Sequence, residues 1–160
     1  MLQEGKDIIF FTHTPQDVKL VAEIMEQIPA IYKRLQVSVS VYDVSTEECV
    51  EQYLRYYRSC DVVVAMRFHA NIFALTQRIP CIALSGHGQI SGLFHELGLD
   101  EQCIIVNRED FGNDLFQLIN DAIDNPHAYI KKEDVMLEKV NKEHYRYITE
   151  VTEIVKMAMQ

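Results

Sequence analysis

The chain has 160 residues, the size of one ordinary domain, and its composition of 48% hydrophobic and 24% charged residues is typical of a soluble globular protein. With 24 acidic and 15 basic side chains the net charge is -9, which argues against a nucleic-acid surface because phosphate contacts need clustered Lys and Arg. No apolar run approaches the roughly 18 residues of a membrane span, and the N-terminus lacks the features of a secretory signal. We expect a cytoplasmic protein without a membrane span.

The four cysteines, Cys49, Cys60, Cys81 and Cys103, are spread along the chain. None of their spacings is typical of a zinc site or a redox pair. We interpret them as reduced, buried thiols and predict no metal site.

Apolar β-branched runs alternate with helical patterns, which is typical of β-α-β units and a parallel sheet. In chain order, we predict a strand over 7–12, a helix over 15–28, a strand over 37–42 and a helix over 45–59. Ser45 and Glu48 form a capping-box pattern at the start of that second helix. A third strand over 61–66 is nearly all apolar, so we expect it to be covered on both faces.

A short helix over 69–78 and a fourth strand over 80–85 come next. Residues 86–92 form a predicted glycine-rich turn into a helix that stops at Gly98, followed by a fifth strand over 103–106 and a helix over 113–124. The last element is a long amphipathic helix over 130–159, whose apolar stripe requires a partner surface.

These elements predict an α/β fold: one Rossmann-like domain over residues 1–160, with helices on both faces of a parallel five-stranded sheet. Right-handed crossovers favour the strand order 2-1-3-4-5, which places the switch point between strands one and three. Ligands should bind beyond the carboxyl ends of these strands. The residues predicted at this edge are His13, Thr14, Arg67 and His69, joined from strand four by Ser85, Gly86, His87, Gly88 and Gln89.

From Val62 to His95 the chain contains no Asp or Glu. Buried strands explain part of this absence, but the turns over 66–71 and 85–91 are also free of acids. Two helix N-termini should open from these turns, and their unpaired amides favour anions. The sequence therefore predicts a negatively charged ligand.

Arg67 or His69 alone could be structural, with the arginine reaching solvent and the histidine capping its own helix. Together at the switch point they favour function, because a guanidinium fork matches phosphate or carboxylate and an imidazole can transfer a proton. His13 and His87 each lie alone in a turn, where a structural role is the simpler interpretation. The glycines of 86–92 do not fit a dinucleotide fingerprint, so we interpret this loop as one that approaches an anion closely.

The run over 60–85, CDVVVAMRFHANIFALTQRIPCIALS, resembles the polysaccharide pyruvyl transferase family. That family shows an Asp-opened strand, then Arg-Leu-His-Ala, an Ile-Phe-Ala helix, Gly-Val/Ile-Pro and another apolar strand. The matching positions here are Arg67-Phe68-His69-Ala70, Ile72-Phe73-Ala74 and Ile79-Pro80. The strong resemblance covers about residues 60–99, with weaker agreement in the first strand and in the helix over 45–59.

The resemblance implies a fold like the C-terminal domain of GT-B glycosyltransferases. It also implies transfer of pyruvate from phosphoenolpyruvate to sugar hydroxyls as a ketal, in polysaccharide biosynthesis, with no metal or other cofactor. Arg67 would hold the phosphate or carboxylate of the donor, and His69 would donate a proton or clamp the phosphate. Family members are about twice this length, so the resemblance further implies a missing N-terminal Rossmann-like domain, onto which the long C-terminal helix would cross.

One departure concerns the loop over 85–89, where family members usually carry a Tyr and a Lys and this chain has Ser-Gly-His-Gly-Gln. Two alternatives stay open. One is a GT-B glycosyltransferase donor domain, although such domains usually use a Glu in this acid-free region. The other is a non-catalytic module of a polysaccharide synthesis complex.

Overall fold

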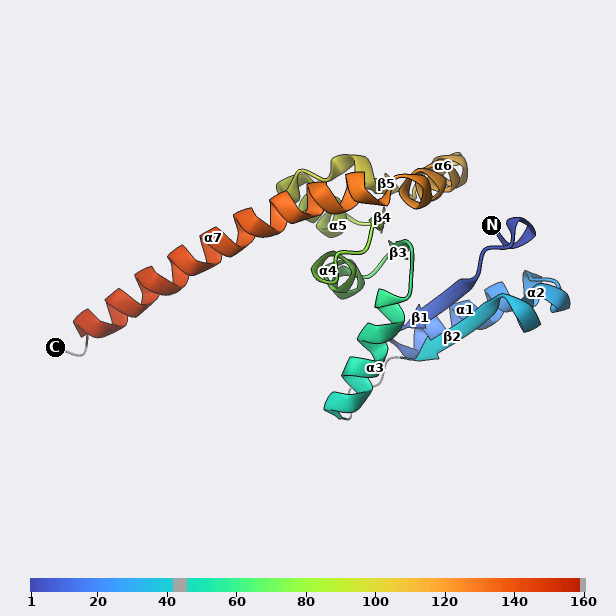
Figure 1. Cartoon of the computed structure of the whole chain (residues 1–160), viewed down its shortest axis with the longest axis horizontal. Helices are drawn as coiled ribbons and strands as arrows, with labels where there is room; N and C mark the ends of the chain where they lie inside the picture. Colours follow the sequence, from blue (N-terminus) through green and yellow to red (C-terminus); the bar gives the residue numbers. More distant parts are fainter. Residues whose placement is uncertain (42–45, 159–160) are drawn as a thin grey trace. The chain divides into compact units, whose positions relative to one another are not determined.

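The structure, a computed structural model, describes residues 1–41 and 46–158. The chain divides into two compact units, Met1–Tyr56 and Tyr57–Gln160 (Figure 1). The prediction of one domain over residues 1–160 stays a prediction.

The first unit contains a two-stranded parallel sheet. Its elements are the 3-10 helix η1 (Leu2–Glu4), β1 (Ile8–Thr12), α1 (Pro15–Gln27), α2 (Ala30–Leu35), β2 (Val37–Val41) and most of α3 (Glu47–Arg58). β1 pairs with β2 from Ile8 opposite Val37 to Thr12 opposite Val41. Helix α2 was not predicted, because its six residues are too short to show a helical period.

The starts of α1 and α3 are set by hydroxyl caps. At α1, Thr14 and Asp17 form a reciprocal capping box, and Pro15 occupies the first turn, where its missing N–H costs nothing. The capping-box prediction for Ser45 falls outside the described residues. Within them, Thr46 Oγ1 accepts a hydrogen bond from the Cys49 amide at 3.2 Å.

The second unit contains a three-stranded parallel sheet in the order β3-β4-β5. Its elements are β3 (Val63–Ala65), α4 (Phe68–Thr76), β4 (Cys81–Ser85), α5 (Gly88–Leu97), the 3-10 helix η2 (Asp100–Gln102), β5 (Cys103–Ile105), α6 (Phe111–Asp124) and α7 (Pro126–Ala158). On one face, Ile82 and Ile104 pack against Ala122 of α6 and Tyr129 of α7. The alternate residues of β4 face the other side, where Cys81 meets α4. Helices therefore cover both faces of the central strand, β4.

The five-stranded sheet and the order 2-1-3-4-5 were wrong: within the described residues, β1 pairs with β2 and β3 with β4, but no ladder joins β1 to β3. β3 is three residues long instead of six, and its central Val64 is 37% exposed, so the strand is not covered on both faces. The predicted turn over 86–92 was also too long, because α5 already begins at Gly88.

All four cysteines are free thiols, as predicted, but only Cys81 is buried and the other three are half-buried. Burial raises the pKa of Cys60, of Cys81 and of Cys103, and nearby carboxylates raise each further. These three thiols are therefore protonated near neutral pH, in which form they are poor nucleophiles.

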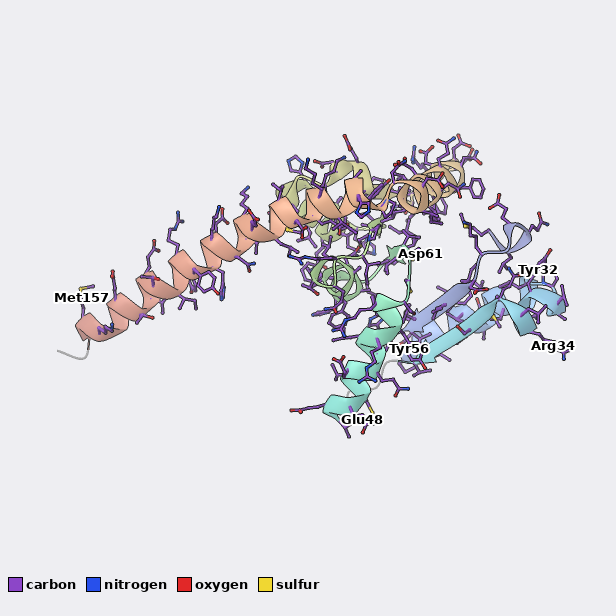
Figure 2. The ribbon with its side chains drawn as sticks, in the orientation of Figure 1. Tyr32, Arg34, Glu48, Tyr56, Asp61 and Met157 are labelled. Atoms are coloured by element: carbon purple, nitrogen blue, oxygen red, sulfur yellow. The ribbon has the colours of Figure 1, made fainter. Side chains whose placement is uncertain are left out.

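Helix α7 is packed at its start and exposed farther along. Among its described side chains Met136 is the last buried one, and those of 138–153, Lys156 and Met157 are exposed. Met157, labelled near the helix end in Figure 2, is 69% exposed. No helix in the described part of the chain is both long and apolar enough to cross a membrane.

Glu133 of α7 is the acid most deeply inserted in this unit, at 0% exposure. Its Oε1 accepts a hydrogen bond of 3.1 Å from the Cys81 amide, while Oε2 has no partner among the described residues. Burial raises the pKa of Glu133 to about 7; the Cys81 hydrogen bond opposes this rise and the charge of Asp134 adds to it. The buried carboxyl group of Glu133 therefore stays protonated below a pH of about 7.

Replacing Glu133 by Gln should change how stability depends on pH. The pKa rises from 4.5 to about 7 on folding, so the wild type binds more protons folded than unfolded between these values and loses stability as pH rises through this window. Glu133→Gln removes that loss. Relative to wild type, its free energy of unfolding should gain up to about 3 kcal/mol between pH 4.5 and pH 8. Urea denaturation measures this, with exposed Glu138→Gln as the control; parallel profiles for wild type and Glu133→Gln would contradict it.

Removing residues 144–160 should leave the fold intact. The described side chains in this stretch are exposed, so the deletion removes little buried apolar area. The free energy of unfolding should change by less than about 1 kcal/mol. Chemical denaturation of the shortened and full chains tests this, and Met136→Ala, which opens a cavity in the core, should cost about 2–5 kcal/mol for comparison. A shortened chain that does not fold would show that the exposed part of α7 is required.

Candidate functional site

The predicted edge in the second unit is formed where β3 and β4 end. The two strands pair in parallel, with Ala65 opposite Ala83, so their carboxyl ends lie side by side and α4 and α5 both begin there. Arg67 is the N-cap of α4 and His87 the N-cap of α5. Both have extended backbone, and neither side chain makes a capping hydrogen bond. The structure therefore brings an arginine and a histidine to adjacent helix starts.

The side chains predicted for ligand contact lie on the surface of this edge. Arg67, His69, His87 and Gln89 are exposed, as is Gly88. The His69 ring contacts Phe68 edge-on, with ring centroids 5.7 Å apart and planes at 85°. The first amides of α4 and α5 have no acceptor within their own helices, and both helix dipoles direct their positive ends here. The arrangement suits an anion.

Ser85 and Gly86 lie at the same strand end, but their polar groups form hydrogen bonds within the protein. Ser85 is 2% exposed, and its hydroxyl donates a 2.8 Å hydrogen bond to the His87 carbonyl. The Gly86 carbonyl accepts from Asn107 Nδ2 at 3.2 Å. A Cβ added at Gly86 would meet Val106 at an ordinary 3.7 Å, so packing does not demand glycine here. In this unit, the two residues shape the loop that carries His87.

His13 belongs to the first unit. Its Nε2 lies 3.2 Å from the Tyr53 hydroxyl, the two rings meet edge-on at 5.8 Å, and its amide donates to Asp17 at 3.0 Å. Since Arg67 and His69 belong to the second unit, the predicted meeting of the three residues stays a prediction.

Each unit contains a hollow, and none of the predicted site residues is part of either lining. One, of about 290 Å³, is in the first unit and is lined by Ile9, Ser38, Val39, Ser40, Val41, Cys49, Gln52, Tyr53 and Tyr56. The other, of about 470 Å³, is in the second unit and is lined by Asp100, Glu101, Cys103, Ile104, Arg108, Asp114, Gln117, Leu118 and Asp121. The acidic lining of the second is unsuited to an anion. Among the described residues, no group of three or more His, Cys, Asp or Glu side chains is placed to hold a metal ion.

Sequence reasoning missed Asn71, whose buried side chain forms a hydrogen bond with the Arg67 backbone. Asn71 is 0% exposed, and its Nδ2 donates to the Arg67 carbonyl at 2.9 Å and to the Ala65 carbonyl at 3.4 Å. Its Oδ1 accepts from the Cys81 thiol at 3.4 Å. The available signal was an amide between the apolar residues Ala70 and Ile72, since buried polar side chains are kept where they have partners.

The parallel strands and the helices that follow them define an α/β protein, and one edge of its second sheet carries a guanidinium, imidazoles and helix-terminal amides. The chain belongs to the polysaccharide pyruvyl transferase family, a family of transferases, since the model of that family matches residues 7–88, more than half of the chain. The match runs from β1 to the first residue of α5 and includes His13, Arg67 and His69; residues 89–99, part of the predicted resemblance, lie outside it. No curated protein and no solved structure matches the chain significantly.

Replacing Ser85 by Ala should loosen the loop that carries His87. The buried hydroxyl donates the 2.8 Å hydrogen bond to the His87 carbonyl, and such a bond is worth about 1 kcal/mol. We expect Ser85→Ala to lower the free energy of unfolding by about that amount in chemical denaturation. The control is Ser91→Ala, whose hydroxyl makes a longer, exposed 3.3 Å bond to the Gly88 carbonyl. Equal stability of both variants would contradict a structural role for Ser85.

Proposed function

We propose that this chain is the C-terminal, Rossmann-like half of a GT-B-like pyruvyl transferase. It would move pyruvate from phosphoenolpyruvate to the hydroxyls of a saccharide in the cytoplasm, during cell-surface polysaccharide biosynthesis. The observation that supports this most directly is the placement of Arg67 and His69 at the start of α4, beside the start of α5, in a chain of this family.

The charge of this edge supports an anionic donor. The turns over 66–71 and 85–91 contain no acid, so no neighbouring carboxylate of those turns competes with a phosphate. The exposed Arg67 would supply a two-pronged contact to phosphate or carboxylate, and the first amides of both helices further donors. A Cβ at Gly88 would meet nothing within 4 Å, so the bare backbone there leaves room for a ligand to approach.

The proposed reaction begins with a proton transferred from His69 to the methylene carbon of phosphoenolpyruvate. The neighbouring carbon then gains cationic character, and one sugar hydroxyl adds to it and transfers its proton to His69, which restores the donor. A second hydroxyl of the same saccharide displaces the phosphate from this carbon, and its proton leaves with the phosphate, which completes the ketal. Arg67 and the helix amides would stabilise the charge on the departing phosphate. His87 lies on the neighbouring turn, where the family's usual lysine is absent, and Gln89 would contribute a neutral donor.

The saccharide acceptor would bind between this chain and an N-terminal Rossmann-like domain. That domain would be the second partner of the chain. The exposed part of α7 is consistent with such a domain. Val140, Tyr147 and Val151 are exposed on this helix and recur at a spacing that keeps them on one face. Covering this stripe would remove apolar surface from water.

Arg67→Ala and His69→Ala test the proposed site. Titrating the chain with phosphoenolpyruvate by calorimetry should show that Arg67→Ala weakens binding by roughly 10–100-fold, since a hydrogen bond to a charged group is worth about 1.5–3 kcal/mol. In the enzyme completed by its N-terminal domain, His69→Ala should abolish pyruvate transfer while the fold is retained.

Matched controls come from the same unit. Arg146→Ala removes an exposed arginine that pairs with Glu150 on α7, and His95→Ala removes an exposed histidine that pairs with Asp100. Both should bind phosphoenolpyruvate like the wild type. Unchanged binding in Arg67→Ala, or normal turnover in His69→Ala, would refute the assigned roles. Binding of a nucleotide sugar without any response to phosphoenolpyruvate would support a glycosyltransferase, and binding of neither would support a non-catalytic module.

A further inference from the structure

Asn71 is joined to three parts of the second unit at once. Its side-chain amide donates to the last carbonyl of β3, at Ala65, and to the carbonyl of Arg67, the N-cap of α4. These two carbonyls flank Met66 and therefore bracket the turn between β3 and α4. The Asn71 backbone amide also donates to the Arg67 carbonyl at 3.1 Å, as the first helical hydrogen bond of α4. One residue thus holds the turn from both its backbone and its side chain.

The orientation of the Asn71 amide is determined by its third partner. The Cys81 thiol on β4 donates to Oδ1 at 3.4 Å, and burial raises the pKa of this thiol, so it keeps its proton. A flipped amide would direct its NH₂ group at a donor and its oxygen at two carbonyls. Every side-chain polar atom of Asn71 therefore has a partner in one orientation and lacks one in the other.

We propose that Asn71 is a positioning residue for the anion site, which holds the turn that aims Arg67 and presents His69. This inference rests on the proposed function for the role of the site, but not for the geometry of the turn. Asn71 is fully buried, so it acts through Arg67 and His69 without touching a ligand. Met66 and Arg67 are exposed, so the buried hydrogen bonds of Asn71 hold this turn from the protein side. Losing these bonds lets the guanidinium sample orientations that do not meet the anion.

The test compares wild type with Asn71→Leu, which keeps the approximate volume, and Asn71→Ala, which ends the side chain at Cβ. Both remove the two carbonyl contacts, whereas a serine could still donate its hydroxyl to the Arg67 carbonyl. Affinity for phosphoenolpyruvate and for inorganic phosphate should fall by roughly tenfold, as expected for about 1.4 kcal/mol. If Asn71→Leu does not fold, Asn71→Ala decides the outcome. A folded variant that binds both anions like the wild type would overturn the proposal.

The control is Gln102→Leu. Gln102 is a carboxamide of the same unit at 2% exposure, and neither its Nε2 nor its Oε1 has a hydrogen-bond partner among the described residues. Its replacement should leave anion affinity unchanged. In the Arg67→Ala background, Asn71→Ala should cost little further affinity, because its effect passes through Arg67. A full additional loss in that background would instead show a general structural role.

A second readout needs no ligand. Backbone ¹⁵N relaxation of the free chain should show order parameters for residues 66–69 falling from about 0.85 towards 0.6 in Asn71→Ala, with the rest of the second unit unchanged. Unaltered order parameters would overturn the positioning role. If the wild type binds neither anion, the proposed function fails, while this measurement still decides whether Asn71 holds the turn.

Discussion

The parallel pairing of β3 with β4 is the constraint on which the candidate site depends. Because the two strands run in the same direction and in register, the helices that follow them must start at the same edge. Each helix start carries partial positive charge and unpaired amides. Two such ends side by side repel each other unless an anion or solvent intervenes, and no acid of the adjoining turns supplies that charge. The backbone geometry of this edge therefore favours an anion before any side chain contributes.

Strand β4 also connects the site with the C-terminal helix. Cys81, at its first position, donates its thiol proton to Asn71 and its amide proton to Glu133. The two buried polar groups differ in kind. Asn71 has partners for all its side-chain atoms and so defines one geometry, whereas Glu133 leaves one oxygen without a partner among the described residues. A fully bonded buried group rigidifies its surroundings, and a partly bonded one costs stability when it ionises. Cys81 on β4 therefore contacts both the residue that orders the turn and the carboxyl group of α7 whose ionisation lowers stability.

Periodic segments were predictable because each carries its signal locally. The cores of the β-strands, the capped start of α1, the end of α5 at Gly98 and the long amphipathic α7 all follow from nearby residues. The prediction failed where partners far apart in the chain decide the outcome, as in the missing ladder between β1 and β3. The helix predicted over 69–78 also ends earlier, at Thr76, and Arg78 has a φ of 56°, in the left-handed region that favours glycine.

By itself, the sequence determined the α/β class, the family, and the residue types that reach the edge of the second sheet, because alternation, capping and motif spacing are local properties of the chain. The tertiary structure alone decided which strands share a sheet, that Ser85 faces inward, and that Asn71 and Glu133 are buried against Cys81. These results depend on non-local packing, in which a polar side chain is retained inside only where a distant backbone group or thiol meets it. The spacing of residues along the sequence does not show which distant groups meet in the fold.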